Sequence, residues 1–267
     1  IEAEWDTHPA PAAFTLFGIP NEETQTTDYA IKIPYVMGLI ATRSTTEEVT
    51  GIKDLISQHE QRIRNGMVSY AQLEQLRAGD KSPELLAAFE ASQKDLGYGL
   101  LLKKYTPNVV DATDEQIKSA AADTIPHVPS LFWAFRAMVG SGFLMLVLFA
   151  LATFAVFKRN LESKPWLLKF AVIALPLPWI AAQTGWYVAE VGRQPWTIGE
   201  VLPTYLSASS ISSADVWGSI IALASFYTVL LIIEMYLMIK FSRLGPSSLH
   251  TGKYHFEKLE AAKKANE

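Results

Sequence analysis

The sequence predicts an all-α integral membrane protein, with three transmembrane helices and an extramembrane helical domain. Charge is unevenly distributed: residues 1–127 carry 19 acidic and 11 basic side chains, and residues 128–267 carry 8 acidic and 12 basic ones. The second part contains three apolar stretches long enough to cross a bilayer as helices. The first part carries helix-capping sequences ahead of short segments with helical apolar spacing. These observations together predict a water-facing acidic domain followed by a membrane-embedded region.

The extramembrane domain is predicted over residues 1–127 and is expected to be mainly helical. Residues 1–35 contain four prolines, so we expect an extended, loop-like segment there, and no strand in the domain. Ser44-Thr45-Thr46-Glu47 matches a capping box and predicts a helix that ends near Gly66. Three further helices are expected, at residues 69–78, from Pro83 toward Tyr105, and from Thr113 onward.

The membrane region is predicted over residues 128–245, with spans at 128–157, 168–190 and 216–240. Basic side chains gather in the loop between the first two spans and again after the third span, whereas the loop between the second and third spans holds only Arg193. Because short loops rich in Lys and Arg stay in the cytoplasm, residues 1–127 are expected to face the periplasm. Residues 246–267 then form a cytoplasmic tail.

Composition excludes several classes of function. The chain has no cysteine, so disulfides and thiolate metal sites are impossible, and any metal or haem must be held by His, Met or carboxylate groups. No glycine-rich phosphate loop, nucleophile–histidine arrangement or basic patch interleaved with aromatic residues occurs, which argues against nucleotide, hydrolase and nucleic-acid readings. Four histidines show no metal-ligand spacing and are interpreted as surface residues: His59, His127, His250 and His255.

The end of the second span concentrates polar and aromatic groups in the run Gly185-Trp186-Tyr187-Val188-Ala189-Glu190-Val191-Gly192-Arg193-Gln194-Pro195-Trp196. Gln183, Trp186 and Glu190 share one helix face. A carboxylate at the end of a span is costly unless it is paired, solvated or bound to a ligand. Spacing alone therefore leaves two interpretations open: an interfacial belt with a Glu190–Arg193 pair, or a ligand site.

Three other residues of the apolar stretches stand out. Arg136 is an arginine near the start of the first span. Charged residues within a span are rare, so we take Arg136 as a candidate functional residue. Met138, two residues later, is on sequence grounds an ordinary filler of apolar space. Glu234 in the third span, with Met238 one turn on, is interpreted as a polar contact to a neighbouring helix, with a proton path as the alternative.

Several long motifs resemble cytochrome bd ubiquinol oxidase, subunit I. They are the run from Gly185 to Trp196 with Ile198–Thr204, and also Ile1–Trp5, Gln58–Met67, Asp95–Lys103, Arg243–Leu249 and Thr251–Phe256. The resemblance covers essentially the whole chain. It places Ile1 about midway through the subunit, so the helices of the N-terminal half, and a lysine implicated in quinol binding, are expected to be absent here.

The resemblance implies roles for six residues. Met138 would be the thioether ligand of a low-spin haem b, with Arg136 beside that haem, where its charge favours the reduced state. Glu190 would be the axial carboxylate of a high-spin haem b. Trp186 would pack against a macrocycle, and Arg193 would pair with a propionate or anchor a lipid phosphate. Glu2 would begin the quinol-oxidation loop and accept a quinol proton.

The function implied is that of a bacterial inner-membrane respiratory oxidase that oxidises ubiquinol or menaquinol, reduces O2 to water and contributes to the proton motive force. A third haem, d or b, would complete the cofactors, with further ligands from the N-terminal half. The implied partners are subunit II, small accessory subunits and membrane lipid, and the fragment alone is not expected to be active. The alternative is a non-catalytic haem-binding or structural subunit whose exposed domain docks a partner. A transporter is disfavoured because three spans without internal repeats fall short of a transporter fold.

Overall fold

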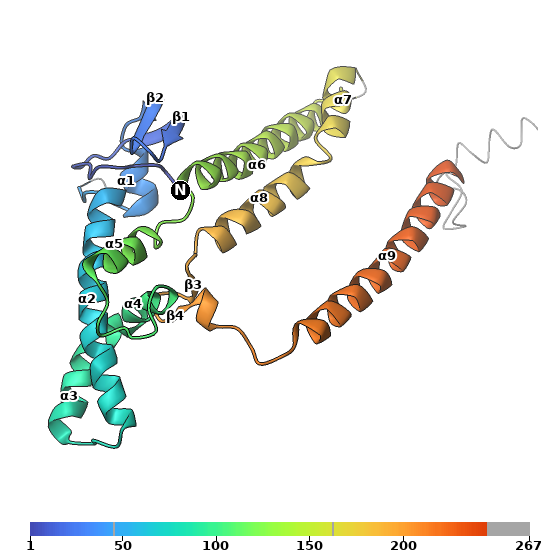
Figure 1. The fold of residues 1–267 in the computed structure, drawn as a ribbon. Helices are drawn as coiled ribbons and strands as arrows, with labels where there is room; N and C mark the ends of the chain where they lie inside the picture. The colour runs from blue at the N-terminus through green and yellow to red at the C-terminus, as the bar shows by residue number, and fades with distance from the viewer. Residues whose placement is uncertain (45, 162, 245–267) are drawn as a thin grey trace, which may run out of the picture. The chain divides into compact units, whose positions relative to one another are not determined.

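The computed structural model describes residues 1–44, 46–161 and 163–244. They belong to two units, residues 1–208 and a second unit that begins at Ser209, and each is described by itself. Most of the described chain is helical (Figure 1). Three helical stretches are long and apolar enough to cross a membrane: Val128–Phe157, Pro165–Val191 and Ser213–Arg243. The predicted helical membrane fold is therefore confirmed, with two small sheets added.

The expectation that the N-terminal region, residues 1–127, contains no strand is wrong. Strands β1 (Phe14–Asn21) and β2 (Thr26–Ile33) form an antiparallel hairpin with register shifts in the middle. Asn21 Oδ1 accepts hydrogen bonds from the backbone amides of Glu23 and Thr24 at 2.9 and 3.2 Å, and these bonds close the turn. Pro9, Pro11 and Pro34 lie outside the two strands, and Pro20 lies within β1 beside the turn, opposite Thr27.

Helix α2 (Ile52–Arg77) begins later than the capping sequence at Ser44 predicts. Its N-cap is Gly51, and the carbonyls of Glu4 and Trp5 accept the first two amides of the helix at 3.0 and 3.1 Å. The N-terminal segment thus satisfies amide groups that have no partner within the helix. A tertiary contact, rather than a local capping box, fixes where this helix starts.

Gly66 does not end the helix, as the sequence analysis expects, and α2 continues through it without a break. A Cβ atom at Gly66 would lie 2.3 Å from the amide nitrogen of Gly99. The absence of a side chain therefore allows two helical segments to touch backbone to backbone. Gly66 is a packing residue within one long helix, and the two expected helices at this place are one.

Four shorter elements pack against α2: α3 (Pro83–Ser92), η1 (Gln93–Asp95), α4 (Leu96–Leu100) and α5 (Asp114–Ala122). Helix α1 (Val36–Ala41) packs against β1, and η2 (Leu101–Lys104) against α4 and α5. Ser82 is the N-cap of α3, with Pro83 in its first turn, and Thr113 forms the expected capping box with Gln116. The buried core of the N-terminal region gathers Ile63, Tyr70, Tyr98, Leu101, Leu102, Val109, Ile117, Ala120, Ala121 and Trp196.

Helix α6 (Val128–Phe157) runs antiparallel to α8 (Leu177–Val191), and the two lie side by side (Figure 1). The second span is not one straight helix. Its first part is α7 (Pro165–Ile173), and a turn at residues 174–176 separates it from α8. Pro176 is responsible, because proline lacks an amide hydrogen and disfavours helical backbone in the residue before it.

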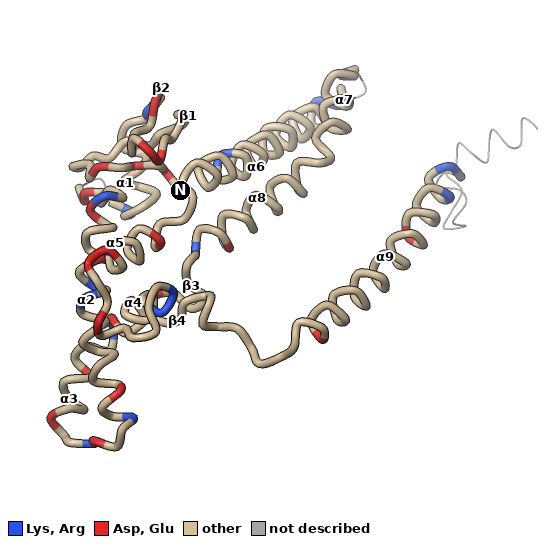
Figure 2. The backbone as a smooth tube through the Cα atoms, viewed as in Figure 1, with Lys and Arg blue, Asp and Glu red and all other residues tan. Residues whose placement is uncertain are grey.

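A short loop follows α8 and returns to the N-terminal region. It contains β3 (Trp196–Ile198), β4 (Leu202–Pro203) and η3 (Thr204–Leu206). The second unit contains α9 (Ser213–Leu244), whose described side chains are exposed within this chain. Charged residues are dense on α2 and sparse on α6 and α8 (Figure 2), in keeping with the charge division of the sequence.

Candidate functional site

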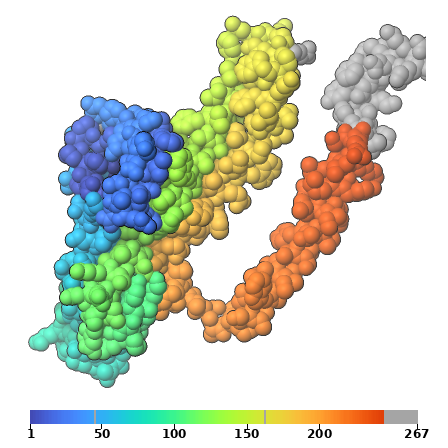
Figure 3. Space-filling view, turned by 45° about the horizontal axis from the view of Figure 1, so that its top comes forward, coloured from blue at the N-terminus to red at the C-terminus, as the bar shows by residue number. Residues whose placement is uncertain are grey.

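The intramembrane arginine that the sequence singles out joins the start of α6 to the N-terminal segment. Arg136 Nη2 lies 3.0 Å from Glu2 Oε2, and the two side chains are only 11% and 12% exposed. The same guanidinium donates to the carbonyls of Leu16 at 2.9 Å, of Phe132 at 3.0 Å, and of Thr15. The N-terminal segment and hairpin lie directly against the first part of α6 (Figure 3). The structure thus brings together Glu2 and Arg136, 134 positions apart.

The electrostatics of this pair are dominated by its burial. Burial raises the pKa of the Glu2 carboxyl above its ordinary value, although the nearby Arg136 charge opposes that change. Arg136 also lies over the ring of Phe132, with Cζ 3.2 Å from the ring centroid, which further withdraws the cation from water. Glu2 is therefore a carboxyl group adjusted toward proton uptake and held beside a fixed cation.

Met138 and Glu190 lie on two packed helices, and their levels follow from the contacts of two glycines. A Cβ atom on Gly185 would lie 3.0 Å from Met138 Sδ, and one on Gly192 would lie 3.8 Å from Leu131. This antiparallel register places Glu190 level with residue 133 of α6. Met138 is five residues further along the helix, or about 7 Å along its axis at 1.5 Å per residue. Both donors therefore lie toward the Val128 end of the helix pair.

The face of α8 that carries Glu190 is open. Trp186 is 64% exposed, and the Glu190 and Arg193 side chains are 42% and 50% exposed. Glu190 Oε1 lies 3.6 Å from Arg193 Nη2, a loose ion pair that leaves the carboxylate oxygens accessible. Gln183 is exposed as well, on the same face. The pair expected for an interfacial belt is present, and the same geometry leaves room for a large flat ligand beside the indole.

A second arginine cluster was not assigned any chemistry from sequence. Arg62 of α2 contacts Asp95, Tyr98 and Glu200, which are 33, 36 and 138 positions away. No local spacing signal predicts such a contact, although each residue lies in one of the motifs on which the family resemblance depends. Their convergence on one guanidinium is a finding of the structure.

Glu4 was also missed. Its carboxylate is 8% exposed and lies 2.8 Å from His8 Nε2 and 3.2 Å from Lys32 Nζ, and it accepts a hydrogen bond from the Thr15 hydroxyl at 2.8 Å. These contacts join the N-terminal segment to both strands of the hairpin. Glu4 thus fixes the backbone that presents Glu2, two residues away.

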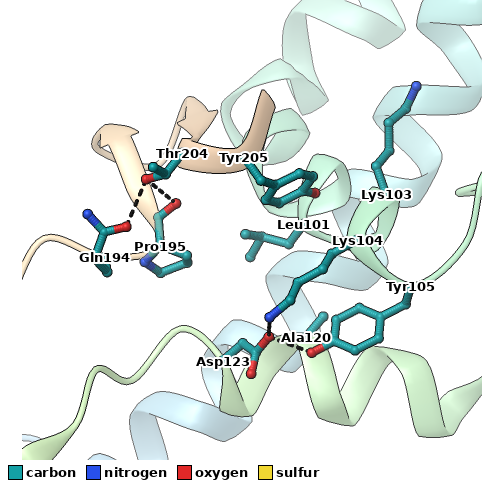
Figure 4. A pocket seen from close by; sticks show the side chains of 10 residues that line it. All are labelled: Leu101, Lys103, Lys104, Tyr105, Ala120, Asp123, Gln194, Pro195, Thr204 and Tyr205. Carbon is teal, nitrogen blue, oxygen red and sulfur yellow. Dashed lines mark hydrogen bonds and ion pairs between the residues drawn. The ribbon is translucent and has the colours of Figure 1, made fainter. Parts of the chain in front are cut away.

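Two cavities flank the loop after α8. One, of about 660 Å³, is lined by apolar side chains and by a cluster in which Lys104 and Tyr105 both bond to Asp123 (Figure 4). Burial and Asp123 raise the pKa of Tyr105 to about 12, so its hydroxyl stays protonated. Tyr205 covers the cavity from η3 and donates to the carbonyl of Leu100.

The other cavity, of about 520 Å³, is lined by His59 together with Arg193 and Glu200. His59, expected to be a surface histidine, is partly exposed, and its Nδ1 lies 2.7 Å from the Thr124 hydroxyl. Burial, assisted by the charge of Arg62, lowers the pKa of His59, which favours the neutral ring. His127 is exposed, as expected, and caps α6 by accepting the Ser130 amide at Nδ1.

The remaining predicted residues are not part of this assembly of side chains. Glu234 and Met238 lie on α9 in the second unit and are exposed there. His250 and His255 lie outside the described residues. Across residues 1–44, 46–161 and 163–244, no group of three or more His, Cys, Asp or Glu side chains is arranged to hold a metal ion.

The fold and the site define a helical membrane protein with a buried Glu–Arg pair and two donors, a thioether and a carboxylate, near one end of two packed spans. Residues 1–246 match the family described as "Cytochrome bd terminal oxidase subunit I". The chain is 38% identical over 251 residues to "Cytochrome bd-II ubiquinol oxidase subunit 1" of Escherichia coli (strain K12), which covers 94% of this chain and 49% of that protein.

It is also 24% identical over 245 residues to "Cytochrome bd ubiquinol oxidase subunit 1" of Bacillus subtilis (strain 168), covering 91% of this chain and 40% of that protein. The chain therefore belongs to the cytochrome bd oxidase subunit I family. It spans about half the length of the curated relatives it matches. The membrane fold and the family membership predicted from the motifs are both confirmed.

Proposed function

We propose that this chain is the C-terminal half of the quinol-oxidising, oxygen-reducing subunit of a cytochrome bd type oxidase. The observation that carries the proposal is the buried Glu2–Arg136 pair. Arg136 lies two residues before Met138 on α6, and α6 packs against α8, which carries Glu190. A proton acceptor is thereby joined, through Arg136, to the helix pair that carries two candidate haem ligands. The relatives supply the activity as an expectation for the whole subunit, of which this chain covers about half.

In this proposal, Glu2 accepts a proton from a quinol hydroxyl. Burial raises the pKa of its carboxyl, so that its proton affinity moves toward that of a working general base. Arg136 holds the carboxylate in place through the 3.0 Å contact and compensates the negative charge left when the quinol loses its proton.

The residues present fit haem ligation in donor chemistry. The Met138 thioether is a soft donor suited to a low-spin haem b, and the accessible Glu190 carboxylate suits a high-spin haem b. The exposed indole of Trp186 lies one turn before Glu190, and the half-exposed Arg193 guanidinium, loosely paired with Glu190, would approach a propionate. Bound haem would supply the one-electron carriers and the oxygen-binding iron. A third haem, d or b, and the remaining ligands would come from the N-terminal half.

The partners and the orientation belong to the same proposal. The substrates are a quinol and O2, and the assembly contains subunit II, small accessory subunits and lipid of a bacterial inner membrane, where turnover contributes to the proton motive force. The extramembrane domain, residues 1–127, faces the periplasm, the membrane region is residues 128–245, and residues 246–267 are cytoplasmic. Cysteines introduced at Ser207 and Ser163 should label from opposite sides of the membrane, Ser207 from the periplasm; labelling of both from one side would refute the arrangement.

The ligand assignment is tested in the full-length oxidase with two substitutions and one control. Met138→Leu keeps the volume but removes the sulfur, so it should convert the low-spin haem to high-spin or lower its potential. Glu190→Ala should perturb the high-spin haem and oxygen reduction and spare the low-spin band. Met235→Leu on α9 should change neither spectrum.

The measurements are reduced-minus-oxidised spectra and redox titration. An unchanged low-spin spectrum in Met138→Leu would reduce Met138 to a core methionine. Intact haem spectra together with absent quinol oxidation in the unsubstituted complex would favour the non-catalytic alternative.

A further inference from the structure

Three sequence motifs without assigned chemistry meet at one guanidinium. Arg62 belongs to the run Gln58–Met67, Asp95 and Tyr98 to the run Asp95–Lys103, and Glu200 to the run that follows α8. Arg62 Nε donates to Asp95 Oδ1 at 2.8 Å, and its Nη1 and Nη2 donate to the two Glu200 oxygens at 2.9 Å each. All three nitrogens of the guanidinium thus donate hydrogen bonds.

The chemistry of this contact requires an arginine. The two parallel bonds to Glu200 are the bidentate arrangement in which a planar guanidinium matches a carboxylate. Its face lies over the Tyr98 ring, with Cζ 4.1 Å from the centroid. The Asp95 side chain is 5% exposed and also accepts from Asn65 at 3.2 Å, so this end of the contact is rigid. A lysine supplies one point charge and cannot reproduce the fork.

The backbone around the cluster is fitted just as closely. A Cβ atom on Gly97 would lie 1.9 Å from the carbonyl oxygen of Glu200, so the turn between β3 and β4 is seated directly on α4. Trp196 is buried in the core of the N-terminal region, with its ring centroid 5.1 Å from that of Tyr98. The loop after α8, residues 192–204, is therefore held by its side chains and by its backbone.

Hydrogen bonds connect this loop to the end of α8. The Thr204 hydroxyl donates to Gln194 Oε1 at 2.9 Å, and Gln194 Nε2 donates to the backbone carbonyl of Glu190 at 3.2 Å. Ten residues separate Glu190 from Glu200, and both ends of this stretch are braced. If Glu200 moved, the loop would move with it, and this would displace Glu190 and Arg193.

We propose that Arg62 is a positioning residue, which fixes the loop after α8 on the extramembrane domain and thereby sets the orientation of Glu190 and Arg193. The proposal rests on the proposed function, in which Glu190 is a haem ligand. Arg62 acts at a distance from the Glu2–Arg136 pair, because none of its contacts involves the hairpin or α6. Its loss should therefore change the haem ligated at α8 without changing quinol affinity.

The test uses the full-length oxidase with Arg62→Gln and the control Arg64→Gln. Arg64 lies on the same helix and pairs with Asp114 at 2.9 Å and Glu60 at 3.8 Å, but it does not touch the loop. Arg62→Gln should shift the high-spin haem band and lower kcat roughly tenfold, with KM for quinol within about twofold, because a misplaced group loses rate and not substrate binding. Arg64→Gln should match the unsubstituted enzyme.

A second variant and a second readout keep the proposal testable if Arg62→Gln fails to assemble. Glu200→Gln leaves Arg62 bound to Asp95 and Tyr98 but replaces one acceptor oxygen with an amide donor, so the charged bidentate link to the loop is lost. It should shift the same band in the same direction and increase hydrogen exchange of amides 192–204. Arg62→Lys should be intermediate. Spectra and exchange in Glu200→Gln equal to those of Arg64→Gln would overturn the proposal.

The two proposals fail separately. If Glu190→Ala leaves the high-spin haem unchanged, the ligand assignment fails, whatever the Arg62 variants do. If Glu190→Ala perturbs that haem and the Arg62 and Glu200 variants leave band and exchange unchanged, the positioning role fails alone.

Discussion

Two Arg–Glu contacts join distant parts of the chain, and their surroundings differ. Arg136 and Glu2 are 11% and 12% exposed, at the junction of the N-terminal segment with α6. Arg62 and Glu200 are 29% and 54% exposed, at the junction of α2 with the loop after α8. The two contacts have the same chemistry and nearly the same length, 3.0 and 2.9 Å. What separates them is how much water each carboxylate has lost.

That difference reverses the direction of the pKa change. Burial raises the pKa of Glu2 despite its arginine, whereas the hydrogen bonds from Arg62 lower the pKa of Glu200, which loses less water. Glu2 is therefore adjusted toward exchanging a proton, and Glu200 toward remaining charged. A distance between two charged groups does not reveal which of these roles a pair has; burial decides it.

The largest expected effect comes from removing the charge of each carboxylate in turn in the full-length oxidase. Glu2→Gln should lower quinol oxidation by about 100-fold or more, because it removes a proton acceptor, a loss that typically costs 10²–10⁴ in rate. The haem spectrum should stay intact. Steady-state quinol oxidation and reduced-minus-oxidised spectra measure both quantities, and loss of haem in Glu2→Gln would mean that the residue is structural.

Glu200→Gln is the matched substitution, since it has the same chemistry and also faces an arginine. It should reduce the rate only several-fold and should act through the high-spin band, as a loss of positioning does. Equal losses of quinol oxidation in the two variants, with both spectra intact, would remove the distinction drawn from burial.

The sequence predicts one part of this molecule much better than the other. Helix α6 covers the apolar stretch from Val128 to Phe157, because a run of that length and composition has few alternatives to a helix. The secondary structure of residues 1–127 is predicted less accurately. Gly66 looks like a helix stop and is a packing residue, and the start of α2 is fixed by carbonyls from Glu4 and Trp5. Tertiary contacts override local signals there.

The candidate site divides in the same way. Glu2 and Glu190 lie within motifs that resemble a known family, and the same resemblance assigns a role to Met138. Arg136 is conspicuous in addition because it is a charge within an apolar run. The contact between Glu2 and Arg136 joins positions 134 apart, so spacing gives no sign of it. Arg62 and His59 were missed for a related reason: on an exposed-looking helix, a charged or polar residue gives no signal until the element that covers it is known.

The smallest expected effect, and the most direct test of the comparison, is the pH dependence of stability. For Glu200 the folded-state pKa is lowered, so its contribution is fully present above the unfolded value near 4.5 and is lost as pH falls through the folded value. For Glu2 the folded-state pKa is raised, so the favourable contribution is present below the unfolded value and is lost as pH rises through the folded value.

Melting temperatures of the oxidase and its Gln variants, measured from about pH 2.5 to pH 8 so that the scan includes the range below 4.5 where Glu200 titrates, should therefore diverge in opposite directions. The unsubstituted protein should gain stability over Glu200→Gln as pH rises through the acid range, by on the order of 1 kcal/mol or less for so exposed a pair. Against Glu2→Gln it should lose stability as pH rises, because an ionised Glu2 is buried and a glutamine is not charged. Parallel curves for both variants would show that the two carboxylates experience the same environment, and the assignment of proton exchange to one and of positioning to the other would fall.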